Sequence, residues 1–215
     1  MRYKIPLEKQ HITYKDKANN KLVGTTTALG ILAKPALYGW YYKMGKDGEN
    51  PYAKKDKAAN IGTIAHEMIM CHLRGWELDP SNLIPEAVST AENCVLSYYE
   101  WEKNLNLVPI LIEEPLISKL GYGGTIDSLL SIDGNNVLCD IKTSSGIYPD
   151  MAYQLAAYRN LLIENGYYVD KTIILNIGKS EDDSFQIKTY SDVEMENSFK
   201  IFKHCLSICK IQRGL

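Results

Sequence analysis

The feature that most constrains this chain is a change in the spacing of its apolar residues near Val108. Before that point, apolar residues recur every three or four positions, which is typical of one face of a helix. After it come short apolar and β-branched runs, and Asp133 and Gly134 separate two of them with the residues of a tight hairpin turn. Helical and strand patterns then alternate, so we expect an α/β fold with a mixed β-sheet flanked by α-helices.

Capping residues help to bound the expected helices. They are expected near 25–42, 57–74, 85–105 and 152–163, with a last helix after 191. Gly45 and Gly48 follow the first helix and Gly166 follows the fourth, where glycine commonly ends a helix. Ser191 and Glu194 have the spacing of a capping box, so they mark the start of the last helix.

The expected strands lie within six apolar segments. These are 109–112, 116–118, 125–130, 137–141, 172–177 and 185–188, of which the first four fit three short strands. A two-residue turn between the third and fourth segments would place Asp127 opposite Asp140, whereas a four-residue loop would place it opposite Lys142. In both registers we expect all three side chains on one face of the sheet.

Two carboxylates in such an apolar setting need a positive partner. Carboxylates directly across a hairpin repel each other, and burial without a partner favours their neutral form. Lys142 could balance one of them, whereas a hard cation such as Mg²⁺ balances both and retains waters for chemistry. Asp127, Asp140 and Lys142 therefore fit a site for metal-dependent phosphodiester hydrolysis, in which the lysine orients or deprotonates the attacking water.

A purely structural role for the same residues is the alternative. Lys142 could form a solvated salt bridge with Asp127 or Asp140 at the edge of a strand. However, the segment 138–141 has the composition of a central strand, where charged residues are costly unless they are used. This favours the functional interpretation.

Two segments resemble the PD-(D/E)xK nuclease superfamily: Gly-Thr-Ile-Asp at 124–127 and Cys-Asp-Ile-Lys-Thr-Ser at 139–144. More narrowly, the chain resembles the RecB-type exonuclease branch, which has a histidine in an early helix, a glutamate before the first acidic strand and a Gln-x-x-x-Tyr helix after the lysine. His66, Glu113, Gln154 and Tyr158 occur in that order, so the resemblance covers roughly residues 60–165. The segment 25–40 is also similar to the start of phage-encoded and mitochondrial single-strand exonucleases.

This resemblance implies a restriction-endonuclease-like fold and a DNA exonuclease that uses Mg²⁺ or Mn²⁺ and acts on single strands or DNA ends. The implied catalytic residues are Asp127, Asp140, Lys142, Gln154 and Tyr158. The implied metal-binding positions are His66, Glu113, Asp127, Asp140 and Ile141. Strand alternation allows only one of Glu113 and Glu114 to face the site, and the family pattern favours Glu113. Gln154 and Tyr158 lie one helical turn apart, so they can reach the same substrate or support Lys142.

Overall charge does not indicate a nucleic-acid partner, because the formal net charge is −2 and the pI is near 6.1. A local strip is different: lysines at 43–57 are interleaved with Tyr41, Tyr42 and Tyr52. The strip lysines are Lys43, Lys46, Lys54, Lys55 and Lys57. We expect them to bind DNA, although Asp47, Glu49 and Asp56 dilute the charge and the lysines could simply solvate a loop.

Other metal sites are less well supported. His66-Glu67 begins a zinc-protease motif, but that motif needs a second histidine at 70, where the chain has a methionine. Some members of the resembled branch hold an iron–sulfur cluster with four cysteines, whereas here only Cys205 and Cys209 lie together near the end. We expect these two to be core residues and expect no iron–sulfur cluster, with a zinc site that adds His204 as the alternative.

Two further functions remain open at this point. A site-specific endonuclease on the same fold would need elements that read bases in the major groove, and no obvious insertion provides them. A nucleic-acid-binding or assembly module that has lost catalysis is the other alternative, although every charged residue of the motif is present.

We expect one nuclease domain over residues 1–215, made of an N-terminal arm (1–56), a catalytic core (57–190) and a C-terminal helix (191–215). The N-terminus lacks the apolar segment of a signal peptide, and no run of ~18 apolar residues could span a bilayer. We therefore expect a cytoplasmic protein with reduced thiols and no membrane partner.

Overall fold

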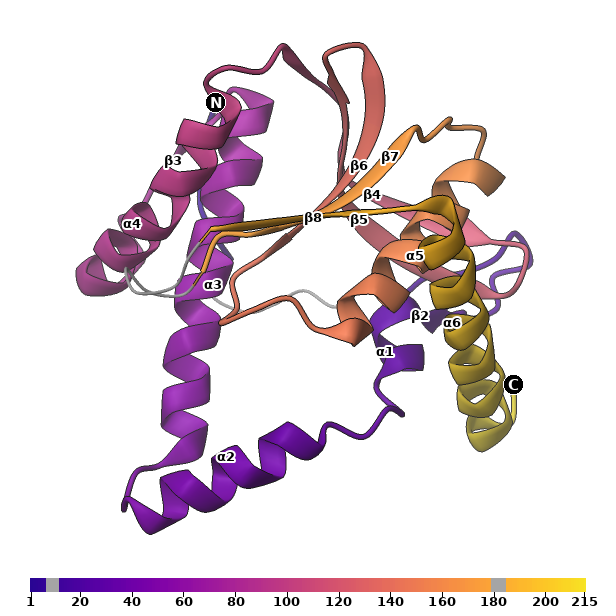
Figure 1. Ribbon diagram of the computed structural model, residues 1–215, viewed down its shortest axis with the longest axis horizontal. Coiled ribbons are helices and arrows are strands. Elements are labelled where there is room, and N and C mark those ends of the chain that lie inside the picture. Colours follow the sequence, from indigo (N-terminus) through magenta and orange to yellow (C-terminus); the bar gives the residue numbers. More distant parts are fainter. Residues whose placement is uncertain (7–11, 179–184) are drawn as a thin grey trace.

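Six helices and eight strands form the described part of this computed structural model, which comprises residues 1–6, 12–178 and 185–215 (Figure 1). The helices are α1 (Thr25–Leu29), α2 (Pro35–Lys46), α3 (Pro51–Arg74), α4 (Pro85–Glu102), α5 (Pro149–Glu164) and α6 (Asp192–Arg213). The strands are β1 (Arg2–Tyr3), β2 (Val23–Gly24), β3 (Glu77–Leu78), β4 (Leu107–Ser118), β5 (Tyr122–Ile132), β6 (Asn135–Lys142), β7 (Lys171–Asn176) and β8 (Gln186–Tyr190). A mixed six-stranded sheet lies among the helices, which confirms the expected fold class.

Strand β5 is the hub of this sheet. It pairs antiparallel with β4 along one edge. On the other edge it pairs with β6 from Ser128 to Ile132 and, in parallel, with β2 at Tyr122 and Gly123. The sheet continues through β7, parallel to β6, and β8, antiparallel to β7. On that second edge, no described strand pairs with β5 between Gly123 and Ser128, and Asp127 lies in this stretch.

The two-residue turn between β5 and β6 is confirmed. The strands pair directly up to Asp133 and Gly134, whose φ angles of 49° and 82° lie in the left-handed region that such a turn requires. The register aligns Asp127 with Asp140, as the shorter turn predicted, although the paired ladder ends one position earlier.

The expected strand segments at 109–112 and 116–118 belong to one strand, β4, of 12 residues. The four segments therefore do make three strands, of which this one is longer than expected. The last two expected segments correspond to β7 and β8, which pair antiparallel with each other.

The first expected helix is divided into α1 and α2. A loop separates Leu29 from Pro35, and proline suits the first turn of α2 because an N–H there would lack a helical partner. The second expected helix, α3, begins at Pro51 rather than 57, since the Asn50 side chain accepts hydrogen bonds from two N–H groups of its first turn.

The remaining helices lie close to their expected ranges. Helix α4 ends at Glu102, three residues early, and α5 begins at Pro149 and ends just before Gly166, which has a φ of 88°. The capping box is confirmed: the Ser191 hydroxyl accepts a hydrogen bond from the Glu194 N–H, and the Glu194 carboxylate accepts one from the Ser191 N–H.

Buried side chains form one cluster on each face of the sheet. Helices α1, α5 and α6 pack on the face that carries Leu138 and Ile174, and α3 and α4 pack on the face that carries Cys139 and Leu175. Figure 1 shows α3 and α4 on one side of the sheet and α5 and α6 on the other. Residues from both layers can therefore meet only where the sheet opens between them.

The five cysteines are all buried, and none of them forms a disulfide with a described residue. Cys205 and Cys209 belong to the cluster under α5 and α6, which confirms that they are core residues. His204 is exposed, so the alternative zinc site is not assembled in this structure.

Helix α2 lies apart from the sheet. In Figure 1 it crosses from the side of α1 to the beginning of α3, so that α1, α2 and α3 form an arch. In the described residues, no helix combines the length and apolar character needed to cross a membrane.

Candidate active site

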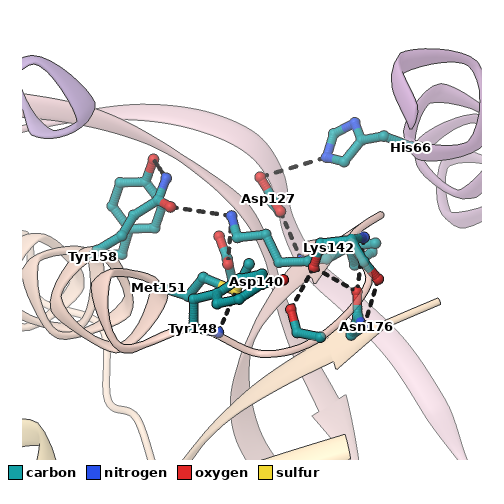
Figure 2. Close-up of polar contacts among 12 residues, drawn as sticks. His66, Asp127, Asp140, Lys142, Tyr148, Met151, Tyr158 and Asn176 are labelled. Atoms are coloured by element: carbon teal, nitrogen blue, oxygen red, sulfur yellow. Dashed lines mark hydrogen bonds and ion pairs between the residues drawn. The ribbon is translucent and has the colours of Figure 1, made fainter. Parts of the chain in front are cut away.

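Asp127 lies where β5 and β6 part. One of its oxygens, Oδ2, accepts a hydrogen bond from the Ile141 N–H at 2.8 Å, which takes the place of the next ladder bond. Its other oxygen lies 3.5 Å from Nε2 of His66, which reaches in from α3 (Figure 2). The side chain of Ile141 is buried in the core, so a main-chain oxygen is all that this residue can offer to a metal.

Asp140 and Lys142 form the second half of the site. The Lys142 ammonium lies 2.6 Å from Oδ2 of Asp140 and donates a hydrogen bond to Oε1 of Gln154 at 3.1 Å. Gln154 in turn donates to the Tyr158 hydroxyl at 2.7 Å. Figure 2 shows this chain of contacts running from β6 to α5. The structure thus brings Lys142, Gln154 and Tyr158 together, with Gln154 supporting the lysine.

Asp140 is the most enclosed of the charged groups. It is fully buried, and apart from the ion pair with Lys142 neither of its oxygens has a hydrogen bond of acceptable geometry to a described residue. Buried carboxylates are normally satisfied. Oδ1 has no partner among the described residues and Oδ2 has only Lys142, so this carboxylate is suited to a small divalent cation, which prefers oxygen ligands.

The pKa values in the site reflect burial and mutual charge. Burial raises the pKa of Asp140 to about 6, against the opposing effect of Lys142. Burial would also raise the pKa of Asp127, but His66 and Lys142 outweigh it and lower that pKa. Burial lowers the pKa of His66, yet Asp127 more than compensates and raises it to about 8. Lys142 stays charged because its two aspartates raise its pKa despite burial.

Glu113 lies beside His66 but is held by an arginine. Its carboxylate lies 2.6 Å from Nη1 of Arg74 in α3. Its φ of 49° is unusual for a residue within a strand, and it occurs at the position aligned with Asp127. Ligand atoms of His66, Glu67 and Glu113 lie within 4.8 Å of one another, so these three could also share a cation. Burial, followed by the Glu113 charge, raises the pKa of Glu67.

Helix α3 approaches the sheet closely at Gly62, one turn before His66. A Cβ at Gly62 would clash with the Thr143 hydroxyl, which directly follows Lys142 in the chain. A larger residue at this position would therefore push α3 away from β6. The absence of a side chain is what lets His66 reach Asp127.

The loop after Lys142 is anchored by Asn176. The Asn176 amide accepts hydrogen bonds from the Ser144 N–H and hydroxyl and donates one to the Ser144 carbonyl, and Asn176 itself is buried (Figure 2). This double-sided contact fixes the exit of β6, and with it the direction of Lys142.

The expected strip lysines lie away from the carboxylates. Lys57 precedes His66 by nine residues on the same helix, roughly 14 Å at ~1.5 Å per residue. Lys54 and Lys57 are paired with Glu49 and Glu86 at 2.6 and 3.3 Å. The structure therefore places the strip on the arch of α2 and early α3, with part of its charge neutralised.

Comparisons with known proteins concern the fold. A crystal structure of a Eubacterium rectale protein described as a “putative exonuclease” superposes with a TM-score of 0.51 at 13% identity, covering 72% of this chain and 68% of that one. The two share a fold. A crystal structure of SSO0001 gives a TM-score of 0.31 at 14% identity, over 68% of this chain and 73% of that one, which is too loose to support an argument. No family model and no curated protein matches the sequence.

Three contributors to the site were not anticipated from the sequence: Arg74, Glu67 and Asn176. Asn176 had a detectable signal, because it is a polar residue in the apolar segment 172–177. Arg74 and Glu67 gave none, since their partners come from a strand some 40 residues later. Together, the described side chains place the buried Asp140 and the half-buried Asp127 between a charged lysine on one side and a histidine on the other.

Proposed function

We propose that this chain hydrolyses phosphodiester bonds of DNA with a divalent metal ion, Mg²⁺ or Mn²⁺. The observation that carries the proposal is the fully buried Asp140 carboxylate, whose one partner among the described residues is the ammonium group of Lys142. A structural salt bridge needs only one carboxylate and tolerates exposure, whereas this arrangement concentrates negative charge where water is scarce. The shared fold with the Eubacterium rectale protein supports the same class of activity.

Asp127, Asp140 and the main-chain oxygen of Ile141 would hold the ion, with His66 completing the set from α3. Glu113 would join only if it exchanged its contact with Arg74 for the ion. When bound, the metal supplies a Lewis acid for the phosphate and lowers the pKa of a bound water.

Lys142 has a distinct task in this proposal. In the metal-free site its pKa is raised by the aspartates, so it carries a proton at neutral pH. In the proposed reaction it donates hydrogen bonds, orienting the water and balancing charge on the phosphate. Gln154, itself held by Tyr158, fixes the direction of the ammonium group.

The substrate is proposed to approach along the arch. Tyr38, Tyr42 and Tyr52 are exposed on α2 and early α3, and the ring of Tyr52 lies 6.1 Å from that of Tyr41. Exposed aromatic rings next to lysines are typical of surfaces that stack single-strand bases and hold their phosphates. This favours a single strand or a free DNA end, threaded toward the carboxylates.

One assay tests both the reaction and the substrate. Purified protein is incubated with end-labelled linear and closed circular single strands, in Mg²⁺, Mn²⁺, Ca²⁺ or a chelator. We expect degradation of linear strands in Mg²⁺ or Mn²⁺ and none in Ca²⁺, whose larger radius gives looser geometry. Equal degradation in chelator would contradict the metal-dependent reaction, and rapid cutting of circles would contradict entry from an end.

A further inference from the structure

A hollow lies beside β5, on the far side of Asp127 from the ladder with β6. It has a volume of about 660 Å³ and is bounded by residues 12–14 and 21–24, the first turn of α1 and the end of α6. Its lining is rich in hydroxyl groups, which come from Thr13, Tyr14, Thr26, Thr27 and Thr125. Hydroxyl groups and cations are common partners of nucleic-acid phosphates.

Thr125 connects this hollow to the catalytic carboxylates. It lines the hollow and precedes Asp127 by two residues on β5, which is ~6.6 Å along a strand. Both residues belong to the stretch whose second edge has no described strand partner. Along this edge, no described strand therefore separates the hollow from Asp127.

Tyr14 forms the part of the lining that lies next to Thr125. Its hydroxyl lies 2.9 Å from that of Thr125, and its ring lies so close over Gly123 that any Cβ there would overlap it. Glycine at 123 is thus required for Tyr14 to sit against β5. The hollow is a built feature of the fold, held by contacts more than 100 residues apart in the chain.

The charge of the hollow suits an anion. Lys21 and Arg213 line it, and within the described chain neither forms an ion pair. None of the described residues that line it has a carboxylate side chain. Lys15 and Lys21 are main-chain partners in a β-bridge across the hairpin, so a further lysine lies next to the hollow.

We infer that this hollow binds a backbone phosphate of the substrate strand next to the scissile bond, through Lys21, Arg213 and the threonine hydroxyls. The inference rests on the proposed nuclease function and specifies how the strand leaves the carboxylates. The site reads charge and not base identity, because phosphate contacts carry no sequence information.

The test compares a double variant, Lys21→Gln with Arg213→Gln, with the single variant Lys17→Gln as a control. Lys17 is exposed on the same hairpin but does not line the hollow. Binding of a fluorescent single strand is measured in chelator at several salt concentrations, and KM and kcat are measured in Mg²⁺. We expect the double variant to raise KM about tenfold with kcat nearly unchanged. Its salt slope should fall by about 0.7 for each lost phosphate contact.

A second measurement uses the substrate. Replacing single phosphates by neutral methylphosphonates should weaken binding to the wild type at one position near the cut, and that penalty should vanish in the double variant. Wild-type KM and salt slope in the double variant would overturn the phosphate subsite while leaving the nuclease proposal intact. A wild-type protein that neither binds nor cuts DNA would instead contradict the proposed function itself.

Discussion

At the scale of single residues, the burial of Asp140 is the feature that favours a metal in the proposed reaction. Its carboxylate is fully buried, its pKa is raised to about 6 by burial, and Lys142 alone does not bring it back to the ordinary range. At neutral pH the metal-free site therefore holds a charge that its surroundings disfavour. In the proposed reaction, a divalent cation held between Asp140 and Asp127 would balance this charge.

The first prediction separates metal binding from chemistry. Asp140→Asn should abolish cleavage and also abolish the rise in Tm that Mn²⁺ produces, because it removes a ligand charge. Lys142→Met should lower kcat at least a hundredfold, as expected for loss of a charged donor at the reacting group, but should keep the Mn²⁺-dependent rise in Tm. Activity assays and thermal denaturation with and without Mn²⁺ provide the two measurements.

Lys171→Ala is the matched control for these variants. Lys171 is an exposed lysine at the start of β7, in the same sheet, and its loss should change neither quantity. If Asp140→Asn and Lys142→Met both retained near wild-type turnover, the reaction would take place elsewhere in the molecule.

The second prediction follows from His66. Its imidazole is held protonated up to a pKa of about 8, mainly by Asp127, which overcomes burial. A metal can bind the imidazole only after that proton leaves, so Mn²⁺ affinity should rise from pH 6.5 to 8.5, by up to tenfold per unit. Asp140 titrates near pH 6 and contributes little in this window. Calorimetric titrations across the range measure the effect.

His66→Gln provides the control for the pH dependence, since glutamine does not titrate and the dependence should flatten. The stability of the metal-free protein should also depend on pH. Because the folded pKa of His66 exceeds its unfolded value of ~6.5, the stability it contributes is complete below pH 6.5 and is lost as the pH rises through 8. Metal affinity that was independent of pH in the wild type would exclude His66 as a ligand.

Residue-level reasoning succeeded where the partners are close in sequence. The two-residue turn aligned Asp127 with Asp140, and helical spacing put Gln154 next to Tyr158. It could not foresee that Arg74 engages Glu113. That contact depends on how α3 lies across β4, which no local pattern encodes.

At the scale of elements, α3 makes a close approach to the sheet. Gly62 lies against Thr143 at the end of β6, and His66 follows one turn later. Gly62, four residues before His66, thus lets the helix lie close to the strand. Its effect on the site is indirect, through the placement of His66.

The third prediction concerns Gly62. Gly62→Ala should lower kcat more than tenfold, because a shift of about 1 Å in a ligand can cost up to a hundredfold. Overpacking should also cost about 1–3 kcal/mol in the free energy of unfolding. Adding Thr143→Ala removes the clashing hydroxyl and should restore part of both quantities.

Gly45→Ala is the control for Gly62→Ala. Gly45 is also helical, in α2, but a Cβ there would meet nothing within 4 Å. We expect this substitution to be neutral or stabilising, since alanine favours helices. A Gly62→Ala protein with full activity and unchanged Tm would show that α3 can move without disturbing the site.

Element boundaries were less accessible from the sequence than element types. Two regular segments proved to be one strand, β4, because Glu113 continues the strand despite a left-handed φ. The break between α1 and α2 also escaped the periodicity, since apolar residues carry on through the loop. In both cases tertiary contacts override local preference.

At the scale of the whole molecule, the arch of α1, α2 and α3 relates the strip lysines to the site. Lys43 and Lys55 are exposed and form no ion pair with the described residues, whereas Lys54 and Lys57 are paired with glutamates. The strip should therefore contribute through its unpaired members. This refines the initial expectation, in which all five lysines were equivalent.

The fourth prediction tests the arch as a path for DNA. Lys43→Glu with Lys55→Glu should weaken binding of a linear single strand and reduce the slope of log affinity against log salt by about 1.4, at ~0.7 per phosphate. Lys171→Glu with Lys200→Glu is the control, with the same change in net charge at exposed positions on β7 and α6, outside the arch. Equal slopes in the two double variants would mean that the strip only solvates the arch.

The fold class was predictable because the whole chain switches its apolar period once and then alternates. The order of the strands in the sheet was not predictable, since it depends on β2 joining the sheet next to β5. Only two residues make that pairing, and their partners lie about a hundred positions away. Such short, distant contacts leave no periodic trace in a sequence.

The hollow between Tyr14 and Arg213 also has a consequence for synthesis. Asp127, Asp140 and Lys142 leave the ribosome about 70 residues before Arg213 does, so a nascent chain carries its reactive groups before it carries the complete anion pocket. Until α6 docks on the sheet, Lys21 stands without its cationic partner. In the proposed reaction, the phosphate pocket is therefore assembled after the carboxylates and Lys142 have been synthesised, once α6 has docked.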